Sequence, residues 1–235
     1  EECGATHPQL MCDKVKEVGA HVGVALDGDA DRVVFADENG KLIDGDQIMA
    51  LIATDWHERG LLKGKGIVAS LMSNLGLERY LEGRGLSLVR TSVGDRYVAE
   101  KMREDGYNVG GEQAGHIILS DYATAGDGLL TALQVLAVLT LKQKPASQVM
   151  KLFTPLPQVL KNVRLSPSLL KIPEVEEILK KAHCKLGKNG RLVVRPSGTE
   201  PLIRIMAEGE DEGLTIEIVD SLMTTLTSLS KKAMA

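Results

Sequence analysis

The sequence is poor in aromatic residues, with two Phe, one Trp and four Tyr among 235 residues. Its core must therefore be built from Val, Leu, Ile, Ala and Met. Hydrophobic residues make up 43% and charged residues 26%, which is the balance of an ordinary folded domain. The length suffices for one large domain or for two modest ones.

Cysteines, basic charge and long apolar runs are also scarce. The three cysteines form no C-x-x-C pair and are odd in number, which favours free thiols in a reducing cytoplasm. The formal charge of −4 argues against a nucleic-acid or anionic-membrane partner, since either would require a basic surplus. No apolar run approaches the roughly 20 residues of a membrane helix.

The N-terminus is acidic and polar, unlike a signal peptide. It lacks an initiator Met and begins abruptly, so we expect the chain to be a fragment of a longer protein.

Strand-length apolar runs alternate with helical patterns along most of the chain. This order predicts an α/β layer with a mixed or parallel sheet up to about residue 141. A proline-rich stretch over 143–158 indicates a linker with a short helix. The remaining strand, helix, strand, strand, helix order predicts a smaller α+β unit. Predicted strands cover 21–26, 32–37, 65–72, 86–93, 107–112, 159–165, 190–196 and 201–210, and predicted helices cover 8–18, 44–60, 76–85, 96–106, 127–141, 173–183 and 211–231.

The first loop whose side chains could form a functional site is "LDGDADR", in which Asp27, Asp29 and Asp31 alternate before Arg32. Carboxylates at this spacing can converge on a hard divalent cation, which removes their mutual repulsion. An EF-hand is excluded because Arg32 occupies its glycine position and the flanks are β-like. The Arg suggests an anion, such as phosphate, beside the metal. A solvated Asp-rich turn is the alternative.

The second loop is "VRPSGTEPLIR", between two predicted strands. Arg195 and Arg204 can make forked bonds to phosphate, and Ser197 and Thr199 add hydroxyls. Gly198 allows backbone N–H groups to approach an anion. The alternative is a hairpin turn in which these residues serve only the backbone.

Two further polar turns follow strands, where ligand sites of α/β proteins gather. In "GGEQAGH", Glu112 and His116 suit recognition of hydroxyls, although a structural His and a surface Glu are alternatives. In "VGDRY", Arg96 is a candidate ligand residue, or a solvated side chain behind a helix cap at Asp95.

In this order the loops resemble those of the α-D-phosphohexomutase superfamily. "DGDADR" is similar to its metal motif DGDxDR, "GEQAGH" to its sugar motif GExSGH, and "RPSGTEP" to its phosphate-binding loop. The stretches "SLMSNLGLE", "TSVGDRYVAEKM" and "GEQAGHIILSDYATAGDG" most resemble the branch that interconverts glucosamine 6-phosphate and glucosamine 1-phosphate.

The resemblance implies a domain organisation. Residues 1–38 would be the end of the family's second domain with the metal loop, 39–151 its third domain with the sugar loop, and 158–235 its C-terminal phosphate-binding α+β domain. The first domain, which carries a phosphorylatable catalytic Ser, has no counterpart in this sequence. We therefore expect no turnover by this chain without the missing N-terminal domains.

The resemblance also implies residue roles. One Mg²⁺ would be held by Asp27, Asp29 and Asp31, and glucosamine 1,6-bisphosphate would be the intermediate and activator. Arg32 and His116 would lie at the reacting end. The substrate-binding residues would be Glu112, Arg96, Arg195, Ser197, Gly198, Thr199 and Arg204. Ala114 departs from the motif's usual Ser, which places substrate preference in question.

Three rivals remain. One is a phosphomannomutase/phosphoglucomutase of the same superfamily. Another is a non-enzymatic module that binds Mg²⁺ and sugar phosphate. The third, an aspartate-nucleophile phosphatase, is disfavoured because its DxDx[TV] pattern is replaced by "DGDAD".

Overall fold

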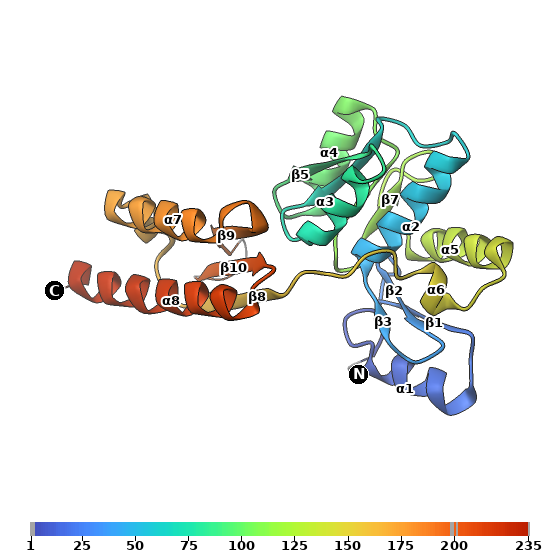
Figure 1. The fold of residues 1–235 in the computed structure, drawn as a ribbon, viewed down its shortest axis with the longest axis horizontal. Helices are drawn as coiled ribbons and strands as arrows, with labels where there is room; N and C mark the ends of the chain where they lie inside the picture. The colour runs from blue at the N-terminus through green and yellow to red at the C-terminus, as the bar shows by residue number, and fades with distance from the viewer. Residues whose placement is uncertain (1–2, 198–199, 201, 235) are drawn as a thin grey trace. The chain divides into compact units, whose positions relative to one another are not determined.

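The computed structural model describes residues 3–197, 200 and 202–234. The chain forms two compact units, Glu1–Thr154 and Pro155–Ala235 (Figure 1). Together they confirm the predicted fold class, an α/β unit with a mixed sheet followed by a smaller α+β unit. Among the described residues, no helix is long and apolar enough to cross a membrane.

The first unit begins with a small antiparallel sheet in the order β1-β2-β3. Strand β2 is buried along its whole length, and α1 packs on one face through Cys12 and Val15. The elements are α1 (Gln9–Val18), β1 (Val22–Leu26), β2 (Val33–Asp37) and β3 (Leu42–Ile43). The tight turn between β2 and β3 is closed by Gly40, whose φ is +66°.

The larger sheet of this unit has the order β5-β4-β6-β7. Strands β4 (Gly66–Ser70), β5 (Ser87–Thr91) and β6 (Val109–Gly111) are parallel, and β7 (Ile117–Leu119) returns antiparallel to β6. Their carboxyl ends carry the loops at 71–74, 92–94 and 112–116. Loops at such ends commonly form the ligand site of an α/β sheet.

Helices cover both faces of this sheet. Helix α4 packs on one face through Val98 and Met102, while α2, α3 and α5 contribute to the main core on the other. Their bounds are α2 (Gly45–Glu58), α3 (Leu75–Glu82), α4 (Asp95–Asp105), α5 (Gly128–Lys142) and the short α6 (Ala146–Val149). Aliphatic residues dominate this core, as the composition requires.

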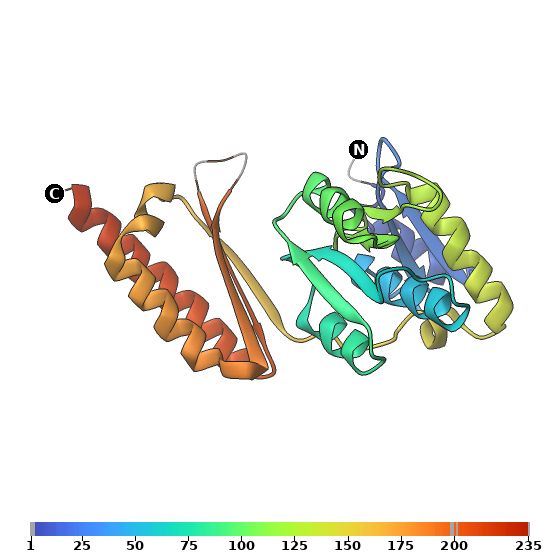
Figure 2. The same ribbon diagram turned by 90° about the horizontal axis from the view of Figure 1, so that it is seen from above.

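The second unit is a three-stranded antiparallel sheet in the order β8-β10-β9. Figure 2 shows α7 and α8 together on one face of that sheet. Ile203, Ile205 and Ala207 alternate along β10 toward these helices. The elements are β8 (Gln158–Val163), α7 (Pro173–Leu186), β9 (Gly190–Pro196), β10 (Ile203–Gly209) and α8 (Glu212–Met234), with short 3-10 turns at Pro167–Lys171 and Gly187–Asn189.

Candidate active site

The three aspartates between β1 and β2 converge. One carboxylate oxygen from each of Asp27, Asp29 and Asp31 lies within 4.8 Å of the other two. The turn is closed by the Ala30 N–H, which donates to the Asp27 carbonyl at 3.2 Å, and by the Arg32 N–H, which donates to Asp27 Oδ1 at 3.0 Å. Ala30 has a left-handed φ of +59°, which reverses the chain within a few residues. The loop thus presents three hard oxygen donors at one point.

The carboxylates of this loop perturb one another. Burial raises the pKa of Asp31, and its hydrogen bond with Asp27 raises it further. Burial acts the same way on Asp27, but hydrogen bonds from the Arg32 N–H and with Asp31 outweigh it, so the pKa of Asp27 is lowered. The Arg32 guanidinium lies 3.7 Å from Asp27 Oδ2. The loop therefore suits a cation that would allow all its acids to ionise together.

The sugar-motif loop between β6 and β7 is a tight turn. The Glu112 N–H donates to the His116 carbonyl, and the Gly115 N–H donates to the Glu112 carbonyl, both at 2.9 Å. Gly115 has a φ of +95°, and a Cβ there would lie 2.3 Å from the Val33 carbonyl oxygen. A larger residue cannot occupy this position without moving backbone. Ala114 is exposed at the tip of the turn.

These two loops are joined to each other. The Val33 N–H donates to the Gly115 carbonyl at 3.0 Å, and Arg32 pairs with His116 as an isolated antiparallel bridge. In addition, His116 Nδ1 lies 3.0 Å from Asp31 Oδ2. The structure therefore brings together two sets of site residues that are more than 80 positions apart in the sequence.

The N-terminus of helix α5 packs against both of these loops. The Gly128 N–H donates to the Ala30 carbonyl at 2.8 Å, and Asp127 caps the helix. The backbone of Gly126 lies against the imidazole of His116, because an added Cβ would come within 2.4 Å of Nε2. Sequence reasoning assigned no role to these residues. The sequence feature that could have indicated their role is "GDG" at residues 126–128, directly before an apolar helix.

The 92–94 loop is held by the sugar loop. Glu112 Oε1 accepts a hydrogen bond from the Gly94 N–H at 3.0 Å, so the carboxylate predicted to contact a sugar already organises a neighbouring loop. Arg96, by contrast, has a side chain that is 79% exposed and pairs with Glu100 on its own helix at 2.9 Å. The structure does not bring Arg96 into contact with the acidic loop at residues 27–32 or with the sugar loop at residues 112–116.

The start of α2 adds two carboxyl groups, one half-buried and one buried, that sequence reasoning treated only as a helix cap. Asp44 is the cap, since its Oδ1 accepts from the Gln47 N–H, and its Oδ2 accepts from Gln113 Nε2 at 3.3 Å. Asp46 is 1% exposed, and its Oδ2 accepts from the Asn74 N–H at 2.8 Å. Burial, together with the negative charge of Asp44, raises the pKa of Asp46 to about 7.

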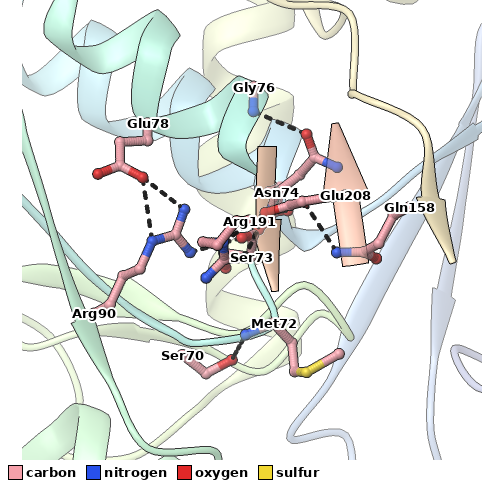
Figure 3. Close-up of polar contacts among 11 residues, drawn as sticks. Ser70, Met72, Ser73, Asn74, Gly76, Glu78, Arg90, Gln158, Arg191 and Glu208 are labelled. Atoms are coloured by element: carbon pink, nitrogen blue, oxygen red, sulfur yellow. Dashed lines mark hydrogen bonds and ion pairs between the residues drawn. The ribbon is translucent and has the colours of Figure 1, made fainter. Parts of the chain in front are cut away.

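The neighbouring 71–74 loop is fixed by an arginine that the motifs did not reveal. Figure 3 shows Arg90 of β5 with Nε and Nη2 on Glu78 Oε2, at 3.2 and 2.9 Å. Its Nη1 donates to the Ser73 carbonyl at 2.7 Å, and Asn74 caps α3 by accepting from the Gly76 N–H. The sequence feature that could have indicated this role is a single charged residue within an otherwise uncharged strand.

In the second unit, Arg195 of β9 lies directly opposite Arg204 of β10. Like charges at facing positions destabilise a sheet unless an anion or acid neutralises them. Ser197 is at the start of the loop that joins these strands. Gly198 and Thr199, which the sequence motif also assigns to this loop, lie outside the described residues.

The next charged row on the same face of this sheet is neutralised internally. Glu208 faces Arg191 on one side and Gln158 on the other. Arg191 Nε donates to Glu208 Oε1 at 2.6 Å, and Gln158 Nε2 donates to Oε2 at 3.2 Å (Figure 3). At the loop end, two arginines face each other instead of an arginine and an acid, and Arg204 Nη2 lies 3.8 Å from Glu200 Oε2. Two guanidinium groups at facing positions suit an anionic ligand.

Comparison with known proteins gives matches over both units. Residues 44–156 match the model of phosphoglucomutase/phosphomannomutase α/β/α domain III, and residues 160–224 match that of the C-terminal domain. The chain is 62% identical over 227 residues to a phosphoglucosamine mutase of Chelativorans sp. (strain BNC1). It is 60% identical over 230 residues to that of Paramagnetospirillum magneticum. Each alignment covers 96% of this chain, and the chain spans about half the length of these relatives.

Solved structures support the same fold. An Aspergillus fumigatus N-acetylphosphoglucosamine mutase, in complex with GlcNAc-6P and magnesium, superposes with a TM-score of 0.76 at 24% identity. The superposition covers 98% of this chain and 53% of that one. A phosphoglucomutase/phosphomannomutase family protein of Burkholderia thailandensis gives 0.78 at 22% identity, covering 95% and 50%. The chain therefore belongs to the phosphoglucomutase/phosphomannomutase family and contains its domain III and C-terminal domain.

Proposed function

We propose that this chain is the metal-, sugar- and phosphate-binding half of a phosphoglucosamine mutase. The whole enzyme would interconvert glucosamine 6-phosphate and glucosamine 1-phosphate through a phosphoserine and glucosamine 1,6-bisphosphate. The observation that carries this proposal is the joint between the acidic loop and the sugar loop, through Val33–Gly115 and Asp31–His116. The identity of about 60% to phosphoglucosamine mutases supports this branch of the family.

The acidic loop fits a single Mg²⁺. Asp27, Asp29 and Asp31 supply carboxylate oxygens, which are the donors that this hard cation prefers. Bound there, Mg²⁺ would supply positive charge to a phosphoryl group in transfer. Asp27 and Asp31 are partly buried and Asp29 is exposed, so the donor set remains open toward a ligand.

The remaining residues of the first unit would bind and orient the sugar. Arg32 is next to the acidic loop and adds a positive group there. Glu112 would accept hydrogen bonds from sugar hydroxyls through the carboxylate oxygen that Gly94 does not occupy. Arg96 remains a proposed substrate contact, which would require its guanidinium to leave Glu100.

The loop end of the second unit would clamp the phosphate that does not react. Arg195 and Arg204 face each other across two strands, and a dianionic phosphate would neutralise both. Ser197, Gly198 and Thr199 would add hydroxyl and backbone donors. Binding of that remote phosphate would position the sugar for phosphoryl transfer, which is a large part of catalysis in this chemistry.

The partner of this half would be the N-terminal domains that carry the phosphoserine, acting in a cytoplasmic enzyme. We retain the proposed division into 1–38, 39–151 and 158–235 as parts of the family's second, third and fourth domains. The first boundary separates the acidic loop from the sugar loop, although both lie in one compact unit.

A second candidate is a phosphomannomutase/phosphoglucomutase. The exposed Ala114 bears on this choice, because the position lacks the hydroxyl of the family motif. The loss of one sugar contact, worth about 1 kcal/mol, puts the preference among hexose phosphates in question. A chimera tests both candidates. The C-terminal half of the Chelativorans sp. mutase would be replaced by this chain, and turnover measured on glucosamine 6-phosphate and mannose 6-phosphate.

We expect the chimera to prefer glucosamine 6-phosphate, and the 235-residue chain alone to give no turnover. A preference for mannose 6-phosphate would favour the second candidate. An inactive chimera that folds but binds no sugar phosphate would contradict the mutase assignment. Bisphosphate-dependent turnover by the chain alone would contradict the requirement for the phosphoserine domain.

A further inference from the structure

The buried imidazole of His116 is the feature that extends the proposed function, and the inference rests on the acidic loop of that function. His116 is 4% exposed, although the sequence motif suggests a residue at the reacting end. Its Nδ1 is 3.0 Å from Asp31 Oδ2. Because an ionised carboxylate only accepts hydrogen bonds, Nδ1 must donate to it.

The ring is held in this orientation from several sides. Its backbone pairs with Arg32, directly after the acidic loop. The backbone of Gly126 covers the ring so closely that an added Cβ would lie 2.4 Å from Nε2 and 2.5 Å from Cε1. Within the described part of the chain, Nε2 is buried and has no hydrogen-bond partner. Asp31 is therefore the group that the imidazole serves there.

The two oxygens of the Asp31 carboxylate have different surroundings. Its Oδ2 receives the bond from His116, while its Oδ1 has no hydrogen-bond partner among the described residues. Groups that ligate metals are commonly held in this manner by an outer hydrogen bond, which fixes their direction before the ion arrives.

We propose that His116 is a positioning residue of the acidic loop. Its Nδ1–H holds the Asp31 carboxylate in the orientation in which the three aspartates receive a divalent cation. In this role His116 acts through Asp31. The sugar loop thereby contributes to metal binding, so that the two loops form one functional element.

The test is a calorimetric titration of the 235-residue chain with Mg²⁺ alone. We compare wild type with His116→Ala, His116→Asn and His116→Gln. The amide nitrogen of Asn takes approximately the place of Nδ1, and that of Gln takes the place of Nε2. We expect Ala and Gln to weaken Mg²⁺ binding about 10- to 100-fold and Asn to restore most of the affinity. His57→Ala, at an exposed position of α2, is the matched control and should bind as wild type does.

The outcomes separate this inference from the proposed function. A wild-type chain that binds no Mg²⁺ overturns both. Wild-type affinity in folded His116→Ala, or rescue by Gln and not by Asn, overturns only the role of His116. A long-range ¹H–¹⁵N spectrum of wild type gives a readout that does not depend on a variant folding. A proton on Nδ1 supports the inference, and a proton on Nε2 alone overturns it.

Discussion

The tripeptide Asp-Gly-Asp occurs twice in the first unit, at residues 27–29 and 44–46, with opposite outcomes. Both copies directly follow a strand. The first forms an open turn whose carboxylates converge, and a Cβ on Gly28 would meet no atom within 4 Å. The second begins α2, and a Cβ on Gly45 would lie 2.2 Å from the Glu112 carbonyl oxygen. The same three residues thus contribute to an open cluster of carboxylates in one place and to a packed joint in the other.

The difference teaches that what surrounds an acidic pair decides its chemistry. The first copy is followed by Arg32 and a β-branched run, which return the chain along β1. The second is followed by residues with helical spacing, so its acids lie at a helix N-terminus. Asp46 is then covered by the 71–74 loop, which no property of the tripeptide itself reveals.

The largest expected effect concerns the pH dependence of stability. The pKa of Asp46 is raised from its ordinary 3.8 to about 7, so the unfolded chain releases this proton at lower pH than the folded chain. Its stabilising contribution is full below pH 3.8 and is lost as pH rises to about 7. Between pH 5 and 8, Asp46→Asn should gain about 3 kcal/mol relative to wild type, at ~1.4 kcal/mol per pKa unit.

Urea denaturation at the two pH values measures this gain. Asp27→Asn is the contrasting variant, because the pKa of Asp27 is lowered in the folded chain. Asp27 stabilises the fold above pH 3.8 and loses this effect only as pH falls below that value, so Asp27→Asn should show no gain between pH 5 and 8. Parallel pH curves for wild type and Asp46→Asn would contradict the burial argument.

The next effect separates the two copies by metal affinity. Removing an outer hydrogen bond commonly costs 10- to 100-fold in metal affinity, so removing a direct ligand should cost at least about 100-fold. Asp27→Asn should therefore abolish Mg²⁺ binding in a calorimetric titration. Asp44→Asn keeps the carbonyl oxygen that caps α2 and should bind as wild type does. Equal losses in both variants would mean that the acidic loop has no special role.

The two glycines give a smaller, purely steric comparison. Gly45→Ala places a methyl group against the backbone of the sugar loop and should destabilise the chain by about 1–3 kcal/mol. Gly28→Ala enters open space and should change the free energy of unfolding by less than about 0.5 kcal/mol. Chemical denaturation without Mg²⁺ distinguishes them, and a neutral Gly45→Ala would refute the close approach.

The smallest expected effect is on stability in the absence of metal, and it compares one acid from each copy, Asp44 and Asp29. Asp44→Ala removes the helix cap and should cost about 1 kcal/mol. Asp29→Ala removes an exposed side chain and should change stability by less than about 0.5 kcal/mol. A thermal melt of each variant checks this difference, which a destabilised Asp29→Ala would contradict.

Much of the fold could be predicted because local patterns and tertiary structure agree. Each predicted helix and strand corresponds to an observed element, with ends shifted by a few residues. The short strands β3 and β7 were missed, since three residues or fewer show no periodicity. The mixed sheet followed from the alternation of strands and helices.

The site was only partly accessible from sequence. Alternate acids in a turn predicted the convergence of Asp27, Asp29 and Asp31, because that geometry is local. The bond from His116 to Asp31 was not predictable, since it depends on how β2 and β7 meet across 85 positions. The facing of Arg195 and Arg204 depends on hairpin register, which the motif alone does not state.

The hydrogen bond between Val33 and Gly115 has a consequence for how this sequence can change over time. It fixes the register of the acidic loop against the sugar loop. An inserted residue in either loop would shift one partner past the other and separate Asp31 from His116. The two segments must therefore keep their lengths together, and variation in length is expected at surface turns that are remote from this joint.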